Sequence, residues 1–241
     1  MGKPLQHWKV LPHGRLAQID ENIITVVGKI HTPLMDLPRR MTVVRLKGSR
    51  LAVFSAIALD DDEMAGLEAF GRPAFLIVPS DKHRLDAKIW KDRYPAMQVV
   101  APAGAREKVE EVVKVDTAAP QFDDQNVHFV VVPGTRGREA ALVVRTANGT
   151  TLVLNDVVGN IRDEAGVGGW LLRLVGFAGK AAQIPKVVKL AMIDDAKALR
   201  AQLLPGRTRC LPGMRSSAGR NPALAANDRR RTRTGVAVGE R

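Results

Sequence analysis

Short apolar segments separated by polar or glycine-containing turns run through the first 154 residues, and this pattern limits the chain to a fold rich in β-strands. Gly48 and the Asn148-Gly149 pair suit tight turns, so the strands on either side of each are expected to form antiparallel hairpins. The run at 74–80 is apolar along most of its length, which is typical of a strand buried on both faces. The predicted strands span residues 23–27, 42–46, 51–57, 74–80, 98–102, 127–132, 140–145 and 150–154.

Helical patterns lie between some of these strands and follow the last of them. Asp60 can accept the free backbone amides of a helix start, Glu63 completes a capping pattern, and this helix is expected to end near Gly71. Valines spaced three and four residues apart predict a second helix within 105–115. Beyond residue 156, helices are expected in 169–179 and 185–204. The mixture of strands and helices predicts an α+β fold.

The excess of positive charge is concentrated at the end of the chain. There are 37 Lys and Arg against 25 Asp and Glu, which gives a formal charge of +12. Residues 205–241 hold nine Arg, no Lys and two acidic residues, and contribute +7 of that total. This segment shows no strand or helix period, so it buries too little apolar surface to offset the entropy of ordering it. We therefore predict a folded domain at 1–204 and a disordered basic tail at 205–241.

Composition excludes several classes of protein. Cys210 is the single cysteine, so no disulfide framework can form within the chain. No apolar run reaches the roughly 18 residues needed to cross a bilayer, and the N-terminus lacks the apolar stretch of a secretion signal. We expect a cytoplasmic protein with no membrane span. The tail has no aromatic side chains for base stacking, which disfavours nucleic acid as a partner.

Polar residues follow two of the predicted strands directly. The sequence DKHRLD at 81–86 follows the strand at 74–80, and Asn155-Asp156 follows the strand at 150–154. Between them, the strand at 127–132 leads into a turn that begins Pro133-Gly134. Strand ends that converge on one edge of a sheet form a rigid frame from which loops can present ligands. These positions therefore predict a metal or substrate site.

In the order of these motifs the chain resembles the metallo-β-lactamase superfamily. A strand pair, the His83 loop, the Pro133-Gly134 turn and a strand ending at Asp156 follow one another as they do in that superfamily. Residues 20–204 are similar in particular to a branch known only as a domain of unknown function. The resemblance implies a four-layer αββα sandwich, with helices outside two packed mixed sheets, and metal-assisted hydrolysis of an ester, amide or phosphoester. The superfamily's last histidine would fall in 205–241, which has none, so the C-terminal strand is expected to be missing or altered.

The residues that would hold metal depart from the superfamily pattern. Active members carry a His-x-His-x-Asp-His loop, because two metal ions need imidazole and carboxylate ligands around an open water position. The loop of this chain has one histidine, His83, and Thr135 stands where a histidine would follow Pro133-Gly134. The resemblance implies a metal set of His83, Asp86 and Asp156, with Asp81 as the alternative to Asp86. Such a set is enough for one weakly bound Zn or Fe ion and not for two.

Each of these residues also has a structural interpretation. His83 can be a surface histidine, Asp81 and Asp86 can cap a helix start, and Asp156 can form a turn. No catalytic residue and no residue for an organic cofactor is predicted.

Other polar residues carry weaker signals. Glu139 and Asn160 match recurrent positions of the branch, and neither has an assigned chemical role. Ser55 and Ser80 lack the G-x-S-x-G surroundings of a nucleophilic serine.

Two functional hypotheses follow. The first is a hydrolase-like protein with a degenerate, mononuclear or empty metal site and an unknown small-molecule substrate. The second is a noncatalytic protein that binds a small ligand or a partner in the same cleft. Residues 205–241 allow two readings of their own: a natural C-terminus replaced through a reading-frame shift, or a basic arm that binds nucleic acid without sequence preference. The sequence specifies no oligomeric state.

Overall fold

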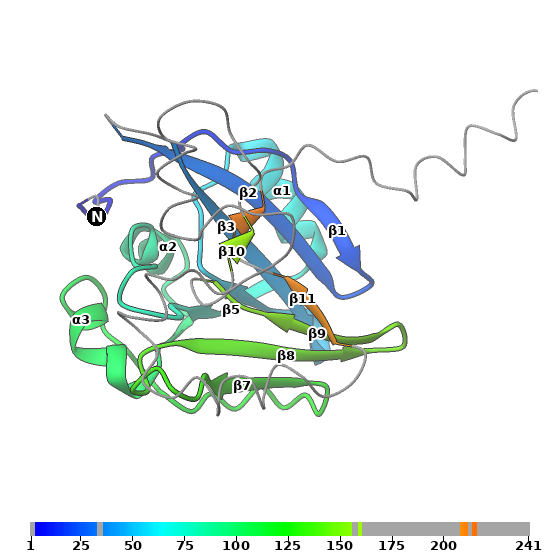
Figure 1. The fold of residues 1–241 in the computed structure, drawn as a ribbon. Coiled ribbons are helices and arrows are strands. Elements are labelled where there is room, and N and C mark those ends of the chain that lie inside the picture. Colours follow the sequence, from blue (N-terminus) through cyan, green and yellow to red (C-terminus); the bar gives the residue numbers. More distant parts are fainter. Residues whose placement is uncertain (1–2, 33–35, 156–158, 161–207, 212–213, 216–241) are drawn as a thin grey trace, which may run out of the picture.

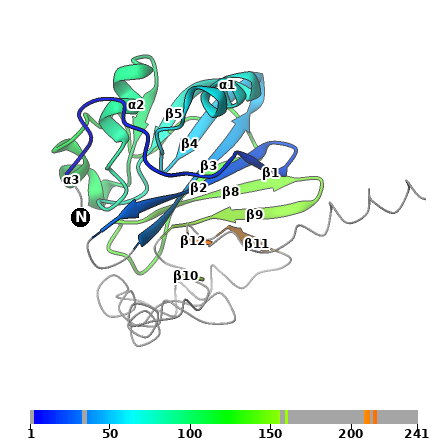
Figure 2. The ribbon, with the colours of Figure 1, turned by 90° about the horizontal axis from the view of Figure 1, so that it is seen from above.

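The computed structural model describes residues 3–32, 36–155, 159–160, 208–211 and 214–215. Within these residues the chain forms a six-stranded sheet, a four-stranded sheet and a pair of short strands, together with α-helices (Figure 1). Figure 2 shows the helices on one side of the six-stranded sheet and the four-stranded sheet on its other side. The described part of the chain is therefore α+β, as the sequence predicts. None of the described helices is long and apolar enough to cross a membrane.

The six-stranded sheet combines antiparallel and parallel pairing. Strands β1 to β4 are antiparallel neighbours, whereas β4, β5 and β6 run parallel to one another. Because β4 and β5 are parallel, their C-terminal ends lie at the same edge of the sheet. The strands in order across the sheet are β1 (Ala17–Asp20), β2 (Ile23–His31), β3 (Asp36–Leu46), β4 (Arg50–Phe54), β5 (Arg72–Ile77) and β6 (Gln98–Val100).

The four-stranded sheet is built from two hairpins and one added strand. Strands β7, β8 and β9 are antiparallel neighbours, and β11 pairs with β9 in parallel. The predicted turn at Asn148-Gly149 joins β8 to β9. Its glycine has a φ of 124°, a conformation that other residues rarely adopt. The strands are β7 (Val127–Val131), β8 (Ala140–Thr146), β9 (Gly149–Val153) and β11 (Thr208–Leu211), and separately β10 (Gly159–Asn160) pairs with β12 (Met214–Arg215).

Apolar side chains fill both faces of the six-stranded sheet. On one face lie three helices, α1 (Asp61–Phe70), α2 (Ala87–Arg93) and α3 (Arg106–Glu110), with Leu67 and Trp90 among the fully buried side chains. On the other face, side chains such as Phe54 pack against Leu142 and its neighbours from the four-stranded sheet. Two short 3₁₀ turns, η1 (Lys47–Ser49) and η2 (Ala103–Ala105), complete the described elements. The six-stranded sheet thus has one apolar layer beneath the helices and a second one that it shares with the four-stranded sheet.

Local sequence signals explain how several elements begin and end. The Asp60 carboxylate accepts the backbone N–H of Glu63 at 3.0 Å, so α1 starts with the predicted cap. The same helix ends at Gly71, whose N–H donates to the Leu67 carbonyl at 3.3 Å. Gly48, between β3 and β4, has a φ of 74°. These three predictions are confirmed.

Other elements differ from the predictions. The helix predicted within 105–115 ends at Glu110. A turn follows, in which the Val113 N–H still donates to the Val109 carbonyl at 3.1 Å, and Val113 and Val115 pack into the core. Helix α2 and strand β1 were not predicted, because seven and four residues are too short to display a period.

The end of the chain contains strands that its composition does not indicate. Strands β11 and β12 lie within 205–241, where a strand can add to an open sheet edge through backbone hydrogen bonds alone, and the predicted disorder of this segment stays a prediction. The predicted domain boundary at 204 and the helices predicted in 169–179 and 185–204 lie outside the described residues.

Candidate functional site

Three strand ends supply the residues around His83. Ser55 directly follows β4, the loop at 78–86 follows β5, and Asn155 lies two residues beyond β9. The backbone N–H of Ala140, at the start of β8, donates to the Pro79 carbonyl at 2.9 Å and joins the two sheets at this point. We refer to these three strand ends together as the rim.

The His83 imidazole is held through its Nδ1 atom. Nδ1 lies 2.9 Å from Ser55 Oγ and 3.1 Å from Asn155 Nδ2. An amide nitrogen can only donate, so Nδ1 accepts and the ring proton of the neutral imidazole lies on Nε2. The Ser55 hydroxyl and the Asn155 amide thus share the single in-plane lone pair of Nδ1.

Ser55 has an unusual backbone conformation for a residue with a side chain. Its φ is 57°, and its backbone N–H donates to the Ile77 carbonyl at 3.0 Å. The residue is buried, with 5% of its surface exposed. Positive φ values cost free energy for residues other than glycine and concentrate at sites where the surrounding structure enforces them. The fold therefore fixes the Ser55 hydroxyl against the imidazole.

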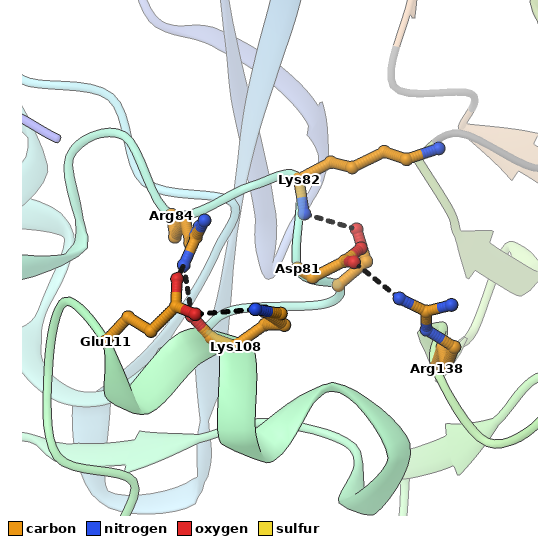
Figure 3. Close-up of polar contacts among 7 residues, drawn as sticks. Asp81, Lys82, Arg84, Lys108, Glu111 and Arg138 are labelled. Atoms are coloured by element: carbon orange, nitrogen blue, oxygen red, sulfur yellow. Dashed lines mark hydrogen bonds and ion pairs between the residues drawn. The ribbon is translucent and has the colours of Figure 1, made fainter. Parts of the chain in front are cut away.

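Hydrogen bonds and ion pairs clamp the His83 loop on both sides (Figure 3). Arg84 donates to Glu111 Oε2 at 2.6 Å and to the Lys108 carbonyl, and Lys108 Nζ donates to Glu111 Oε1 at 2.7 Å. On the other side, Arg138 donates to Asp81 Oδ2 at 2.8 Å. The hydrogen bonds from Lys108 and Arg84 lower the pKa of Glu111 to about 2. The Glu111 carboxylate thus stays ionised throughout the neutral range.

The turn between β7 and β8 is shaped by Thr135, the residue at the position where the superfamily has a histidine. Its Oγ1 donates to the Val132 carbonyl at 2.7 Å and accepts the Glu139 N–H at 3.3 Å. Thr135 is buried, and its hydroxyl therefore serves the turn itself. Glu139 is fully buried directly before β8, where it follows this turn.

Asp86 lies in the interior beneath the rim loop. With 1% of its surface exposed, it forms an ion pair with Arg39 through Oδ2 and accepts the Ala58 N–H at 2.9 Å through Oδ1. Burial raises the pKa of Asp86, and the charge of Arg39 opposes this rise. Both carboxylate oxygens thus have protein partners, and the ligand role of Asp86 stays a prediction.

The described residues do not by themselves form a metal centre. They contain no group of three or more His, Cys, Asp or Glu side chains that could hold a metal ion. His83 supplies one imidazole, and Asp156 lies outside the described residues, directly after Asn155. Asn160 is in β10, and nothing is described of its side chain. At least one further ligand would have to come from beyond the described residues, where the predicted ligand Asp156 lies.

Comparison with known proteins identifies the fold. No protein-family model and no curated protein matches the chain. Among solved structures, the metallo-β-lactamase DIM-1 exposed to ceftazidime aligns with a TM-score of 0.57 at 10% identity, over 86% of this chain and 91% of its own. The metallo-β-lactamase FIM-1 from Pseudomonas aeruginosa, in its mono-zinc form, aligns with a TM-score of 0.54 at 10% identity, over 86% and 90%. TMB-1 aligns with a TM-score of 0.54 at 10% identity, over 86% and 91%.

These likenesses show that the chain has the metallo-β-lactamase fold. At 10% identity they establish the fold alone.

Sequence reasoning missed Ser55 and Asn155 as neighbours of His83. The G-x-S-x-G pattern does not detect Ser55, because the positive φ of this residue occurs after β4 in a sequence that lacks the two glycines. Asn155 stands next to the predicted ligand Asp156, and its place at the end of an apolar strand was the available signal.

Proposed function

We propose that this chain is a hydrolase-like protein of the metallo-β-lactamase fold whose metal site is degenerate and holds either one weakly bound ion or none. The contact between His83 and Asn155 carries this proposal, because it puts the imidazole beside the chain that continues into Asp156. The solved structure of FIM-1 in a mono-zinc form shows that one ion can occupy this fold. The substrate would be a small molecule that reaches the rim.

The ligand set for a single zinc or iron ion would be His83, Asp156 and either Asp86 or Asp81. An ion bound there would act as a Lewis acid on an ester, amide or phosphoester. His83 Nδ1 faces the Asn155 side-chain amide and the Ser55 hydroxyl, so an ion bound by this imidazole would have to use Nε2.

The proposal extends to the layers of the fold. We propose the four-layer αββα sandwich that the resemblance implies, with helices outside two packed mixed sheets. The folded domain would then end near residue 204.

Metal content tests the proposed site. We expect inductively coupled plasma mass spectrometry to find at most one Zn or Fe per chain, and any such metal to fall to background in His83→Ala and in Asp156→Ala. His128→Ala is the matched control, because His128 is exposed on β7 away from the rim loop, and this variant should keep the wild-type content. Two ions per chain, or one that survives both rim substitutions, would contradict the proposal. A metal-free protein whose stability is unchanged by Asp156→Ala would favour the noncatalytic binding role.

A further inference from the structure

We propose that residues 3–16, which we call the N-terminal arm, act as a detachable strap on the loop at 78–86. In the attached state the arm holds the end of this loop in place, and in the detached state the loop gains freedom at the rim. The inference concerns the conformation of the loop, so it goes beyond the proposed function and holds whether or not the rim binds a metal ion. Figure 2 shows the arm passing α2 on its way to β1.

The first two attachment points of the arm lie beside the loop and α2. The Leu5 N–H donates to the Leu85 carbonyl at 2.9 Å, at the end of the loop. Trp8 packs its ring against that of Trp90 in α2, with the ring centroids 5.6 Å apart. Trp8 also donates through Nε1 to the Leu59 carbonyl at 3.1 Å. The arm therefore contacts both the end of the loop and the helix that follows it.

The remaining attachment points lie farther along the arm. The Pro12 carbonyl accepts the backbone N–H of Lys29 at 2.8 Å. The backbone N–H of Asp60 donates to His13 Nε2 at 3.1 Å. Lys29 lies in β2 and Asp60 caps α1, so both belong to the body of the domain. Their two amides lose these acceptors when the arm leaves.

The arm covers the core and is not part of it. Every residue from 3 to 16 is at least partly exposed, and the arm forms no helix or strand. In the core against which it packs, Ile57, Leu59 and Trp90 have at most 1% of their surface exposed. A segment with few buried side chains and no regular secondary structure opens at a lower cost in free energy than the core does. The arm can therefore detach while the sheets stay folded.

Two buried side chains beside the arm favour its detachment. Arg39 Nε and Nη2 and Trp90 Nε1 are buried without a hydrogen-bond acceptor among the described residues. A Cβ atom at Gly28 would lie 3.3 Å from the Pro12 carbonyl oxygen and 3.4 Å from Arg39 Nε, so the arm passes close to the guanidinium. Trp8 covers Trp90. Because a buried donor without an acceptor costs free energy, hydration of these groups offsets part of the contacts that are lost.

Native-state hydrogen exchange followed by nuclear magnetic resonance tests the strap on the full chain. In the wild type, the amides of Lys29 and Asp60 should have equal protection factors, because one opening releases both. Their protection should be at least about 100-fold lower than that of Val43, in the middle of β3. Protection of Lys29 and Asp60 as strong as that of Val43 would mean that the arm opens only when the whole domain unfolds, and it would overturn the inference.

Trp8→Ala removes the largest side-chain contact of the arm. We expect exchange at Lys29 and Asp60 to become at least about 10-fold faster, with no change at Val43. His7→Ala is the matched control, because His7 is an exposed residue of the same arm, and this variant should keep the wild-type rates. An equal acceleration at Val43 in Trp8→Ala would mean that the whole domain is destabilised, and would contradict a separate opening of the arm.

Exchange at Ala87 tests the connection between the arm and the loop. The Ala87 N–H donates to the Arg84 carbonyl at 3.3 Å, across the turn that contains Leu85. In Trp8→Ala this amide should exchange faster by about the same factor as Lys29, because Leu85 has lost its contact with the arm. Faster exchange at Lys29 with unchanged exchange at Ala87 would show that the arm opens without freeing the loop, and the inference would be wrong.

Discussion

Replacing Asp86 with asparagine is expected to lower the free energy of unfolding by about 3 to 5 kcal/mol. Asparagine keeps the shape of the side chain and can still accept the Ala58 N–H, but it removes the negative charge beside Arg39. Arg39 is 9% exposed, and its Nε and Nη2 have no hydrogen-bond acceptor among the described residues. The substitution would leave this guanidinium buried without a counter-charge. An unpaired buried charge destabilises the folded state strongly. Urea unfolding followed by circular dichroism measures the loss.

Two further variants show whether the loss comes from the buried pair. Asp92→Asn, on the helix α2 that directly follows Asp86, removes an exposed partner of Lys88 and should change stability by less than about 1 kcal/mol. The double replacement Arg39→Met with Asp86→Leu removes both charges and should recover most of the loss. A chelator should leave the Asp86→Asn loss unchanged. If the loss were seen only with metal present, the carboxylate would be acting as a ligand and not as the partner of Arg39.

Leu142→Ala is expected to cost about 2 to 5 kcal/mol of unfolding free energy. Leu142 lies on β8 with 0% of its surface exposed, and the side chains that cover it include residues of the six-stranded sheet such as Phe54. Its burial therefore depends on the packing of the two sheets against each other. Thermal and urea unfolding measure the effect.

The control for this substitution is Leu37→Ala, the same change on a strand residue that is 41% exposed. It should cost less than about 1 kcal/mol, because little apolar surface is lost from the interior. Equal effects of the two substitutions would mean that the apolar interface between the sheets contributes little to stability.

Local pattern was enough to predict most strands and the start of α1. Residues 73–77 of β5 form an unbroken apolar run because both faces of a central parallel strand are covered. Asp60 and Gly71 bound α1 through interactions within a few residues, and these are visible in the sequence. The approach of the His83 loop to the end of β9 was also predictable, since polar residues follow both strands.

Long-range partners were not predictable in this way. The Arg39–Asp86 pair joins residues 47 positions apart, and nothing in either local sequence distinguishes a buried carboxylate from a helix cap or a ligand. The contact of Ser55 with His83 depends on the parallel pairing of β4 and β5, which brings the residues after both strands to the same sheet edge. Similarly, β11 pairs with the open edge of β9. The order of apolar residues in 205–241 does not indicate this pairing, because the partner strand lies far away in the sequence.

The meeting of the strand ends at His83 can be measured directly by nuclear Overhauser spectroscopy on selectively labelled protein. The 3.1 Å separation of Asn155 Nδ2 and His83 Nδ1 predicts strong cross-peaks between the Asn155 side-chain amide protons and the carbon-bound protons of the His83 ring. Asn126, which precedes β7, provides an amide in the same spectrum that should give none. Absence of the Asn155 cross-peaks in folded protein would mean that the two strand ends do not share a rim, and the proposed hydrolase-like site would lose its basis.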